Sequence, residues 1–109
     1  MNYHTVITAN DLQPGSMKSV RAAGKDILLA NVNGVFFAIA RKCPHMGANL
    51  CRGKFVGSVV TCPVHGAAFD VTDGQVIKDP KLLFLKMKAK NAKTFSVKVV
   101  DDQVLVGLE

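Results

Sequence analysis

Two short segments that pair cysteine with histidine place the strongest constraint on how this chain can fold. The first occupies residues 43–47 (CPHMG) and the second occupies residues 62–66 (CPVHG). Each supplies one thiolate and one imidazole, a proline that stiffens the turn, and a glycine that lets backbone come close to a bound group. Two such loops indicate a metal site, and their ligands can meet only if the fold brings the loops face to face.

The spacing within the loops separates two metal chemistries. Histidine follows cysteine by two positions in the first loop and by three in the second. A lone tetrahedral zinc usually takes two cysteines from one knuckle and two histidines from a helix, a spacing that differs from this one. A two-iron, two-sulfide cluster with cysteines on one iron and histidines on the other needs one of each from two facing loops. The pattern therefore favours the cluster, with structural zinc as the alternative.

The complete motif, including its spacer, resembles that of the Rieske family. The resemblance implies one Rieske domain over residues 1–109, with a cluster-binding subdomain of about residues 42–72 inserted into a larger base of β-strands. It also implies one [2Fe-2S] cluster. In that arrangement Cys43 and Cys62 bind the buried iron, while His45 and His65 bind the outer iron near the surface.

The residues around the ligands predict where the redox potential falls. High-potential relatives carry a serine and a tyrosine at the positions of Ala67 and Phe69, and a disulfide clamp at those of Ala48 and Val64. Without these hydroxyl donors we expect a potential near the bottom of a window of about −150 to +300 mV. The residues expected to surround the ligands are Pro44, Met46, Gly47, Pro63, Val64, Gly66, Ala67 and Phe69.

Short apolar strands and turn signals alternate through the rest of the chain. Asn33-Gly34 separates two apolar runs and predicts a tight hairpin, because both residues accept positive φ. Thr72-Asp73-Gly74 predicts another hairpin. Residues 79–85 could form a short helix, but a loop leading into a strand at residues 85–89 suits an all-β fold better. Near the carboxyl end, alternating apolar residues flank Asp101-Asp102. We expect an all-β, antiparallel sandwich or barrel of about nine or ten strands.

Charge narrows the choice of partner. The 109 residues include 14 Lys and Arg against 8 Asp and Glu, a formal net charge of +6. Nucleic acid is a poor partner, since the lysines are interpreted as scattered through strand-like segments and few aromatic residues could stack on bases. A redox partner with an acidic docking face suits the charge better, and a merely solvated face is the alternative. The candidate docking residues flank the first loop: Arg41, Lys42, Arg52 and Lys54.

The third cysteine bears on the compartment. Cys51 lies outside the ligand pattern, and we interpret it as a small buried hydrophobe rather than a redox-active thiol. An odd thiol indicates a reducing compartment. The sequence has neither a signal-peptide pattern nor an apolar run long enough to span a membrane, so we expect a cytoplasmic protein with no membrane partner.

These features indicate an electron-transfer protein rather than an enzyme, since no catalytic nucleophile or general base is evident. The resemblance implies a soluble one-electron carrier between a flavin-dependent reductase and a terminal oxygenase, like the ferredoxin components of bacterial aromatic-ring dioxygenases. Many of those ferredoxins are acidic, so the net charge of +6 is a departure. Two alternatives stay open: the small Rieske subunit of an assimilatory nitrite reductase, and a zinc-stabilised interaction module.

Overall fold

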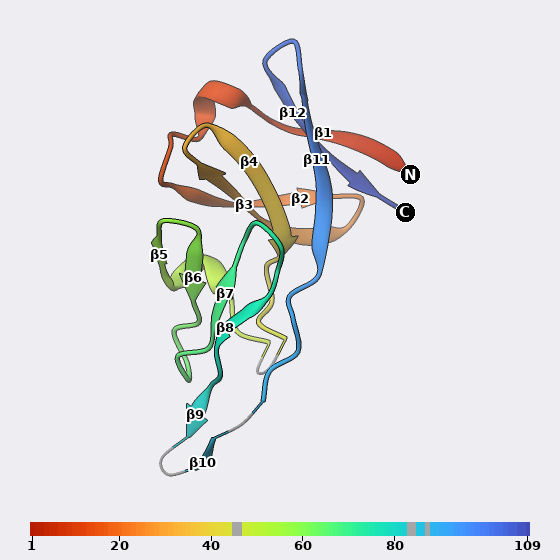
Figure 1. Ribbon diagram of the computed structural model, residues 1–109. Helices are drawn as coiled ribbons and strands as arrows, with labels where there is room; N and C mark the ends of the chain where they lie inside the picture. Colours follow the sequence, from red (N-terminus) through yellow and green to blue (C-terminus); the bar gives the residue numbers. More distant parts are fainter. Residues whose placement is uncertain (45–46, 83–84, 87) are drawn as a thin grey trace.

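The computed structural model describes residues 1–44, 47–82, 85–86 and 88–109. Its secondary structure is built almost entirely from β-strands (Figure 1). The described residues form twelve strands and two short 3-10 helices: β1 (Asn2–Thr8), η1 (Ala9–Asp11), β2 (Met17–Ala22), β3 (Lys25–Val32), β4 (Val35–Ala40), η2 (Leu50–Arg52), β5 (Lys54–Val56), β6 (Val59–Thr61), β7 (Ala68–Asp70), β8 (Val76–Lys78), β9 (Lys81–Leu82), β10 (Leu85–Lys86), β11 (Thr94–Val100) and β12 (Gln103–Leu108).

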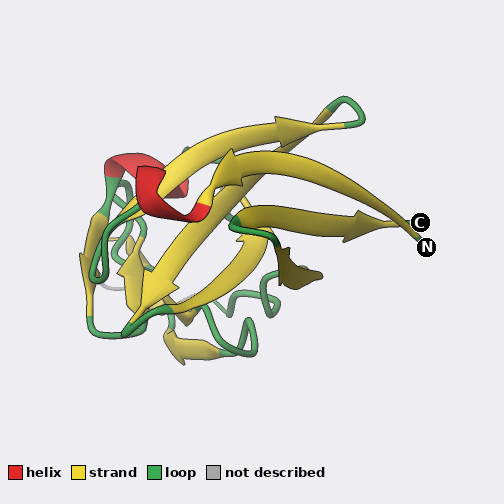
Figure 2. Ribbon diagram, turned by 90° about the horizontal axis from the view of Figure 1, so that it is seen from above, coloured by secondary structure: helices red, strands yellow, loops and turns green. Residues whose placement is uncertain are grey.

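Six strands form one antiparallel sheet in the order β1-β12-β11-β4-β3-β2. The edge strands β1 and β2 come close to each other, so the sheet curves into a half-barrel (Figure 2). Because β1 pairs with β12, the two termini lie side by side (Figures 1 and 2). The expectation of an all-β antiparallel fold is confirmed, with a few more strands than predicted.

Strand β3 is buried on both faces, and Ile27, Leu28, Leu29 and Ala30 each have 0% of their surface exposed. Side chains alternate across a strand, so Ile27 and Leu29 fill the interior of the half-barrel while Leu28 and Ala30 pack on the opposite side. A continuous apolar run is what a strand between two cores requires. Strand β3 therefore supports both halves of the molecule.

Tight turns set the register of the half-barrel strands. Asn33 (φ 51°) and Gly34 (φ 91°) join β3 to β4, which confirms the predicted hairpin. Asp101 (φ 49°) and Asp102 (φ 65°) likewise join β11 to β12. The turn between β2 and β3 places Ala23 at φ 48°, a conformation that the Cβ of alanine disfavours.

The other described strands belong to the inserted segment, residues 41–93, which leaves the large sheet after β4 and returns to it at β11. The inserted segment contains a four-stranded sheet, β5-β6-β7-β8, and the hairpin β9-β10 (Figure 1). The turn between β7 and β8 confirms the hairpin predicted at residues 72–74. In this turn the N–H of Gly74 donates to the carbonyl oxygen of Asp70 at 2.7 Å. The inserted segment extends past the limits of about 42–72 expected for the subdomain.

A second apolar core joins the inserted segment to the half-barrel. Phe69 of β7 is its largest fully buried side chain, and Leu28 of β3 meets this core from the half-barrel side. The buried members of this core are Leu28, Ala30, Ile39, Cys43, Leu50, Val60, Cys62, Ala67, Phe69, Val71 and Ala92. Both loop cysteines are thus part of the packing that holds the two regions together.

Candidate metal centre

The two cysteine loops close in the same way. The first follows β4, and there the N–H of Cys43 donates to the carbonyl oxygen of Ala48 at 2.8 Å. The second joins β6 to β7, and there the N–H of Cys62 donates to the carbonyl oxygen of Ala67 at 2.7 Å. In both loops the acceptor lies five residues after the cysteine. The two loops therefore share one backbone arrangement, called the loop frame from here on, in which the N–H of the cysteine bonds the carbonyl oxygen five residues later.

Glycine completes this frame at the same position of each loop. Gly47 has φ 71° and Gly66 has φ 75°, and each lies four residues after its cysteine. A side chain at such a φ is strained, so glycine is required by the turn itself. Histidine stands two positions after cysteine in the first loop and three in the second. The two loops thus share their closing hydrogen bond and their glycine, but they differ in the sequence position of the histidine.

The two cysteine side chains lie together beneath the loops. Cys43 is 2% exposed and Cys62 is 3% exposed, and the two thiols are within hydrogen-bonding reach of each other. Burial raises the pKa of the Cys62 thiol, while the backbone N–H groups of Val64 and His65 point at its sulfur and favour the thiolate. The thiolate is the form that binds metal, so these N–H groups offset part of the cost that burial places on the binding form.

The predicted histidine ligands differ in what the structure describes. His65 is partly buried, and its carbonyl oxygen accepts a hydrogen bond from the N–H of Lys81 at 3.0 Å. His45 lies outside the described residues, so its role stays a prediction. Within the described ranges, no group of three or more His, Cys, Asp or Glu side chains is placed to hold a metal ion.

The residues predicted to surround the ligands fall into two groups. Ala67 and Phe69 have 0% exposure and share the core with both cysteines, whereas Gly66 is half-buried. The exposed members are Pro44, Gly47, Pro63 and Val64. Met46 lies outside the described residues. The side chains of Ala67 and Phe69 therefore offer no polar atom to the two thiols. Val64 makes the exposed tip of the second loop apolar.

Cys51 lies in η2 at the margin of the second core. It is half-buried, and its N–H donates to Oδ1 of Asn49 at 2.9 Å. Burial raises the pKa of the Cys51 thiol, and the positive charge of Arg41 acts in the opposite direction. All three cysteines carry free thiols. This placement fits the interpretation of Cys51 as a small hydrophobe.

Arg41 differs from the other candidate docking residues because its side chain is only 27% exposed. Its guanidinium lies 3.2 Å from a carboxylate oxygen of Asp26 and donates to Oγ of Ser19 at 3.0 Å. These contacts fasten the start of the first loop to β2 and β3. The remaining candidates are exposed: Lys42, Arg52 and Lys54.

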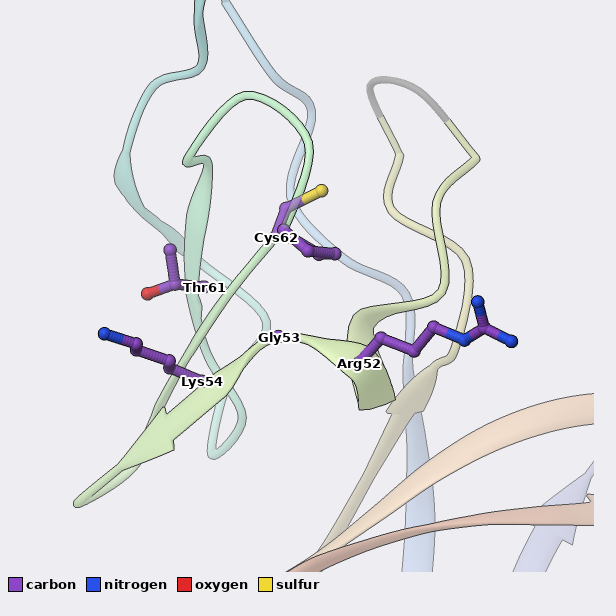
Figure 3. Close-up of a pocket in the computed structure, with 6 residues that line it drawn as sticks. Arg52, Gly53, Lys54, Thr61 and Cys62 are labelled. Carbon is purple, nitrogen blue, oxygen red and sulfur yellow. The ribbon is translucent and has the colours of Figure 1, made fainter.

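An open groove of about 410 Å³ lies beside Cys62 (Figure 3). Arg52 and Lys54 extend from it in opposite directions, with Gly53 between them (Figure 3). A Cβ on Gly53 would overlap the carbonyl oxygen of Thr61, the residue before Cys62. The sequence alone does not reveal this requirement, because nothing near Gly53 shows which distant backbone crosses it.

Comparison with known proteins identifies the family. The description Rieske [2Fe-2S] domain matches residues 2–89. This match covers most of the chain, so the chain belongs to the Rieske [2Fe-2S] domain family. The fold and the resemblance predicted from the two loops are confirmed, and a domain of this family implies a [2Fe-2S] cluster.

Individual relatives show which members the chain is similar to. It is 36% identical to the ferredoxin component of biphenyl 2,3-dioxygenase from Rhodococcus jostii (strain RHA1), over 95% of this chain and 91% of that protein. The ferredoxin–oxygenase complex of carbazole 1,9a-dioxygenase includes a chain that superposes with a TM-score of 0.84 and 30% identity, covering 98% of this chain and 97% of that one. Mouse apoptosis-inducing factor 3 is 34% identical over 94% of this chain, which spans only 16% of that protein's length.

The described residues fit the cluster that the family implies. Two buried thiols lie side by side, backbone N–H groups face one of the sulfurs, and the two loops that carry the cysteines close through the same kind of backbone hydrogen bond. Soft thiolates of this kind are the protein ligands of iron–sulfur clusters. In the described part of the chain, no helix has the length and apolar character needed to cross a membrane.

Proposed function

We propose that this chain is a one-electron carrier that takes an electron from a flavin-dependent reductase and delivers it to the terminal oxygenase of an aromatic-ring dioxygenase system. The observation that carries the proposal is the duplicated loop frame, which brings Cys43 and Cys62 together in a buried site. The likeness to a dioxygenase ferredoxin over 91% of that protein's length supports it. When bound, a [2Fe-2S] cluster supplies a one-electron redox couple.

The family resemblance assigns the residues that would hold the cluster, and the burial of the cysteines supports this assignment. Cys43 and Cys62 would hold the inner iron, consistent with their 2% and 3% exposure. His45 and His65 would hold the outer iron, and the partial exposure of His65 would give electrons a short way out. We take residues 1–109 as a single Rieske domain with a cluster-binding subdomain of about residues 42–72. We also place it in the cytoplasm, where a thiol such as that of Cys51 stays reduced.

The same surroundings set a low potential. Ala67 and Phe69 are fully buried beside the thiols and offer no hydroxyl to a ligand sulfur. Hydrogen bonds to the sulfurs raise the potential, so their absence at these two positions lowers it. Installing hydroxyls through A67S and F69Y should therefore shift the midpoint upward.

Reconstitution with iron and sulfide tests the proposal. We expect visible charge-transfer absorption and, by protein-film voltammetry, a midpoint near the bottom of the window of about −150 to +300 mV. A midpoint above about +100 mV would contradict the low-potential assignment. Zinc by elemental analysis, with no charge-transfer absorption, would instead favour a zinc-stabilised interaction module.

Basic residues beside the first loop form the proposed contact with a partner. One of the similar structures is a complex of oxygenase and ferredoxin in carbazole 1,9a-dioxygenase, and we propose an equivalent contact here. Lys42, Arg52 and Lys54 are exposed and could meet an acidic face, while Arg41 acts through its bond to Asp26. The double variant R52E/K54E should slow electron exchange at low ionic strength, and unchanged rates would remove these residues from the contact.

A further inference from the structure

The positive charge of this chain is concentrated in one stretch. Residues 78–93 contain six lysines and one aspartate, which amounts to +5 of the formal net charge of +6. The remainder of the chain is almost balanced, with eight basic and seven acidic residues. This stretch, called the lysine segment from here on, corrects the interpretation that the lysines are scattered. It accounts for nearly all of the departure from neutrality.

The lysine segment runs directly past the second cysteine loop. Lys81, the first residue of β9, donates its N–H to the carbonyl oxygen of His65 at 3.0 Å. Lys78, the last residue of β8, pairs with Ala68, three residues after that histidine. Hairpin β9-β10 then projects beyond the four-stranded sheet, at the end of the molecule away from the termini (Figure 1). The charge thus lies beside a predicted ligand.

Side chains fasten the returning leg of the lysine segment to the outgoing leg. The N–H of Ala89 donates to Oδ1 of Asp79 at 3.4 Å, and the N–H of Val76 donates to Oδ1 of Asn91 at 3.0 Å. Lysines from both legs are therefore held near each other in the inserted segment, except Lys93, whose carbonyl oxygen accepts a hydrogen bond at 2.9 Å from the N–H of Ala40 at the end of β4.

These lysines carry charge that the described part of the chain leaves uncompensated. The two ion pairs among the described residues both involve Asp26, far from this segment in the sequence. Neighbouring like charges repel, so the concentration of lysines costs stability. Of the exposed lysines, Lys93 lies over the ring of Phe95, with its Nζ 5.5 Å from the ring centre. The exposed lysines of the segment are Lys78, Lys81, Lys88, Lys90 and Lys93.

An exposed apolar side chain lies close to these charges. Val64 is 50% exposed and directly precedes His65, whose carbonyl oxygen accepts the hydrogen bond from Lys81. Ile77 of β8 is also exposed, but consecutive side chains of a strand point to opposite faces, so it does not share the face of Lys78. Apolar contacts with a charged rim are typical of protein–protein interfaces. The surface thus combines a short route to His65, an apolar contact point and a strong excess of positive charge.

We propose that the lysine segment is the docking surface for an acidic face of the protein that exchanges electrons with this chain, an inference that rests on the proposed function. Attraction between opposite charges raises the rate of association and is screened by salt. The backbone N–H of Lys81 is hydrogen-bonded to the carbonyl oxygen of His65. A partner held by the lysine segment would therefore lie close to His65, the proposed route by which electrons leave. Electron donor and acceptor would then occupy the same surface in turn.

A redox protein of known charge tests this inference. The reconstituted, reduced chain is mixed in a stopped-flow instrument with succinylated cytochrome c, which is acidic, or with native cytochrome c, which is basic. Variant K81Q/K88Q/K90Q is compared with K18Q/K25Q/K98Q, which removes the same charge from exposed positions of the half-barrel. At low ionic strength the first variant should reduce the acidic protein about five-fold more slowly than wild type, and the control less than about two-fold. Native cytochrome c should show the opposite trend.

Each outcome decides for or against the inference. Equal slowing by both variants would mean that only net charge matters, and unchanged rates would mean that the segment docks nothing. Either result overturns the inference. A third outcome is that wild type cosediments with phosphatidylserine vesicles and K81Q/K88Q/K90Q does not, while the electron-transfer rates of the two proteins are equal. That outcome would overturn the inference, because the lysine segment would then bind a membrane surface. A wild type that takes up no cluster overturns the proposed function as well, and visible absorption reveals this before any kinetics.

Discussion

The half-barrel and the inserted segment achieve their structures by different means. In the half-barrel, two-residue turns and alternating side chains fix the strands, and the register between β3 and β4 continues without interruption. In the inserted segment the strands are short, and the fold depends on loop closures and on backbones that cross at close range. The second core joins the two through β3. The site is therefore built in the region with less regular structure, and it is supported by the more regular one.

Their charges differ as well. In the half-barrel the carboxylate of Asp26 lies within 3.7 Å of Arg21 and 3.2 Å of Arg41. The lysine segment of the inserted region has one acidic residue, Asp79, for six lysines. The charge of Asp26 is thus paired with neighbouring arginines, whereas the excess positive charge of the lysine segment lies beside His65.

The largest effect should come from the two faces of β3. L28A removes a side chain from the core beneath the cysteines, and L29A removes one from the half-barrel interior. Both are fully buried, so each should lower the free energy of unfolding by about 3 kcal/mol in urea titrations. Only L28A should also lower the iron content of reconstituted protein. Equal iron loss in both variants would show that the two cores act as one unit.

The next effect should come from the close backbone crossing in the inserted segment. G53A places a Cβ against the carbonyl oxygen of Thr61 and should destabilise the protein by about 2 to 3 kcal/mol, with loss of visible absorption. G57A is the matched control, since its Cβ meets nothing within 4 Å and only its φ of 63° is unfavourable. The control should cost about 1 kcal/mol and keep the cluster. If G53A behaves like G57A, the crossing does not constrain the second loop.

A smaller effect should depend on pH. A hydrogen bond from the Thr72 hydroxyl, 2.7 Å long, is the main cause that lowers the pKa of Asp70 below 3.8, and the Thr72 N–H adds to it at 2.9 Å. A lowered pKa stabilises the fold above the unfolded value and loses that contribution as the pH falls through the folded value. D70N should therefore cost less than about 1 kcal/mol at pH 7, because the carboxylate is partly exposed.

The pH series for Asp70 has its own control. Urea titrations of D70N and wild type should converge as the pH drops below 3.8. D73N removes a carboxylate that bonds the N–H of Gln75 at 2.9 Å in the same turn, and so reports how much of the effect is general to the turn. A D70N deficit that persists undiminished at pH 2 would show that the charge of Asp70 is not responsible.

The smallest effect should be a gain in stability in the half-barrel. Ala23 occupies φ 48° in an exposed turn, where glycine avoids the clash of a Cβ. A23G should raise the free energy of unfolding by about 0.5 to 1 kcal/mol in thermal or urea unfolding. G34A, in the corresponding turn between β3 and β4, should have the opposite sign. A loss in A23G would mean that backbone entropy outweighs the strain.

Local chemistry explains why much of the half-barrel could be predicted. Asn33-Gly34 and Asp101-Asp102 tolerate positive φ, and the structure places turns at both pairs. Ala23-Gly24 escaped prediction because alanine at that φ goes against its preference. The two cysteine–histidine loops could be recognised as a candidate cluster site because chemistry restricts which residues bind a cluster and at what spacing.

The inserted segment was less predictable because its contacts are not local. Strand β5 has only three residues, too few for a periodic pattern, and residues 79–85 fitted both a helix and a loop leading into a strand where the structure has β9. The need for glycine at Gly53 depends on Thr61, whose approach no neighbouring residue signals. Likewise, the importance of Lys81 follows from its hydrogen bond to the backbone of His65.

The pairing of β4 with β11 also has a consequence for the order of folding. Ile39 meets Thr94 only after the ends of residues 41–93 come together, because that whole stretch lies between the paired strands. Closing a flexible loop of this length costs roughly 3 to 4 kcal/mol of chain entropy. Any event that compacts the inserted segment beforehand shortens this loop and lowers the kinetic barrier. We therefore expect β11 to pair with β4 only after the inserted segment has become compact.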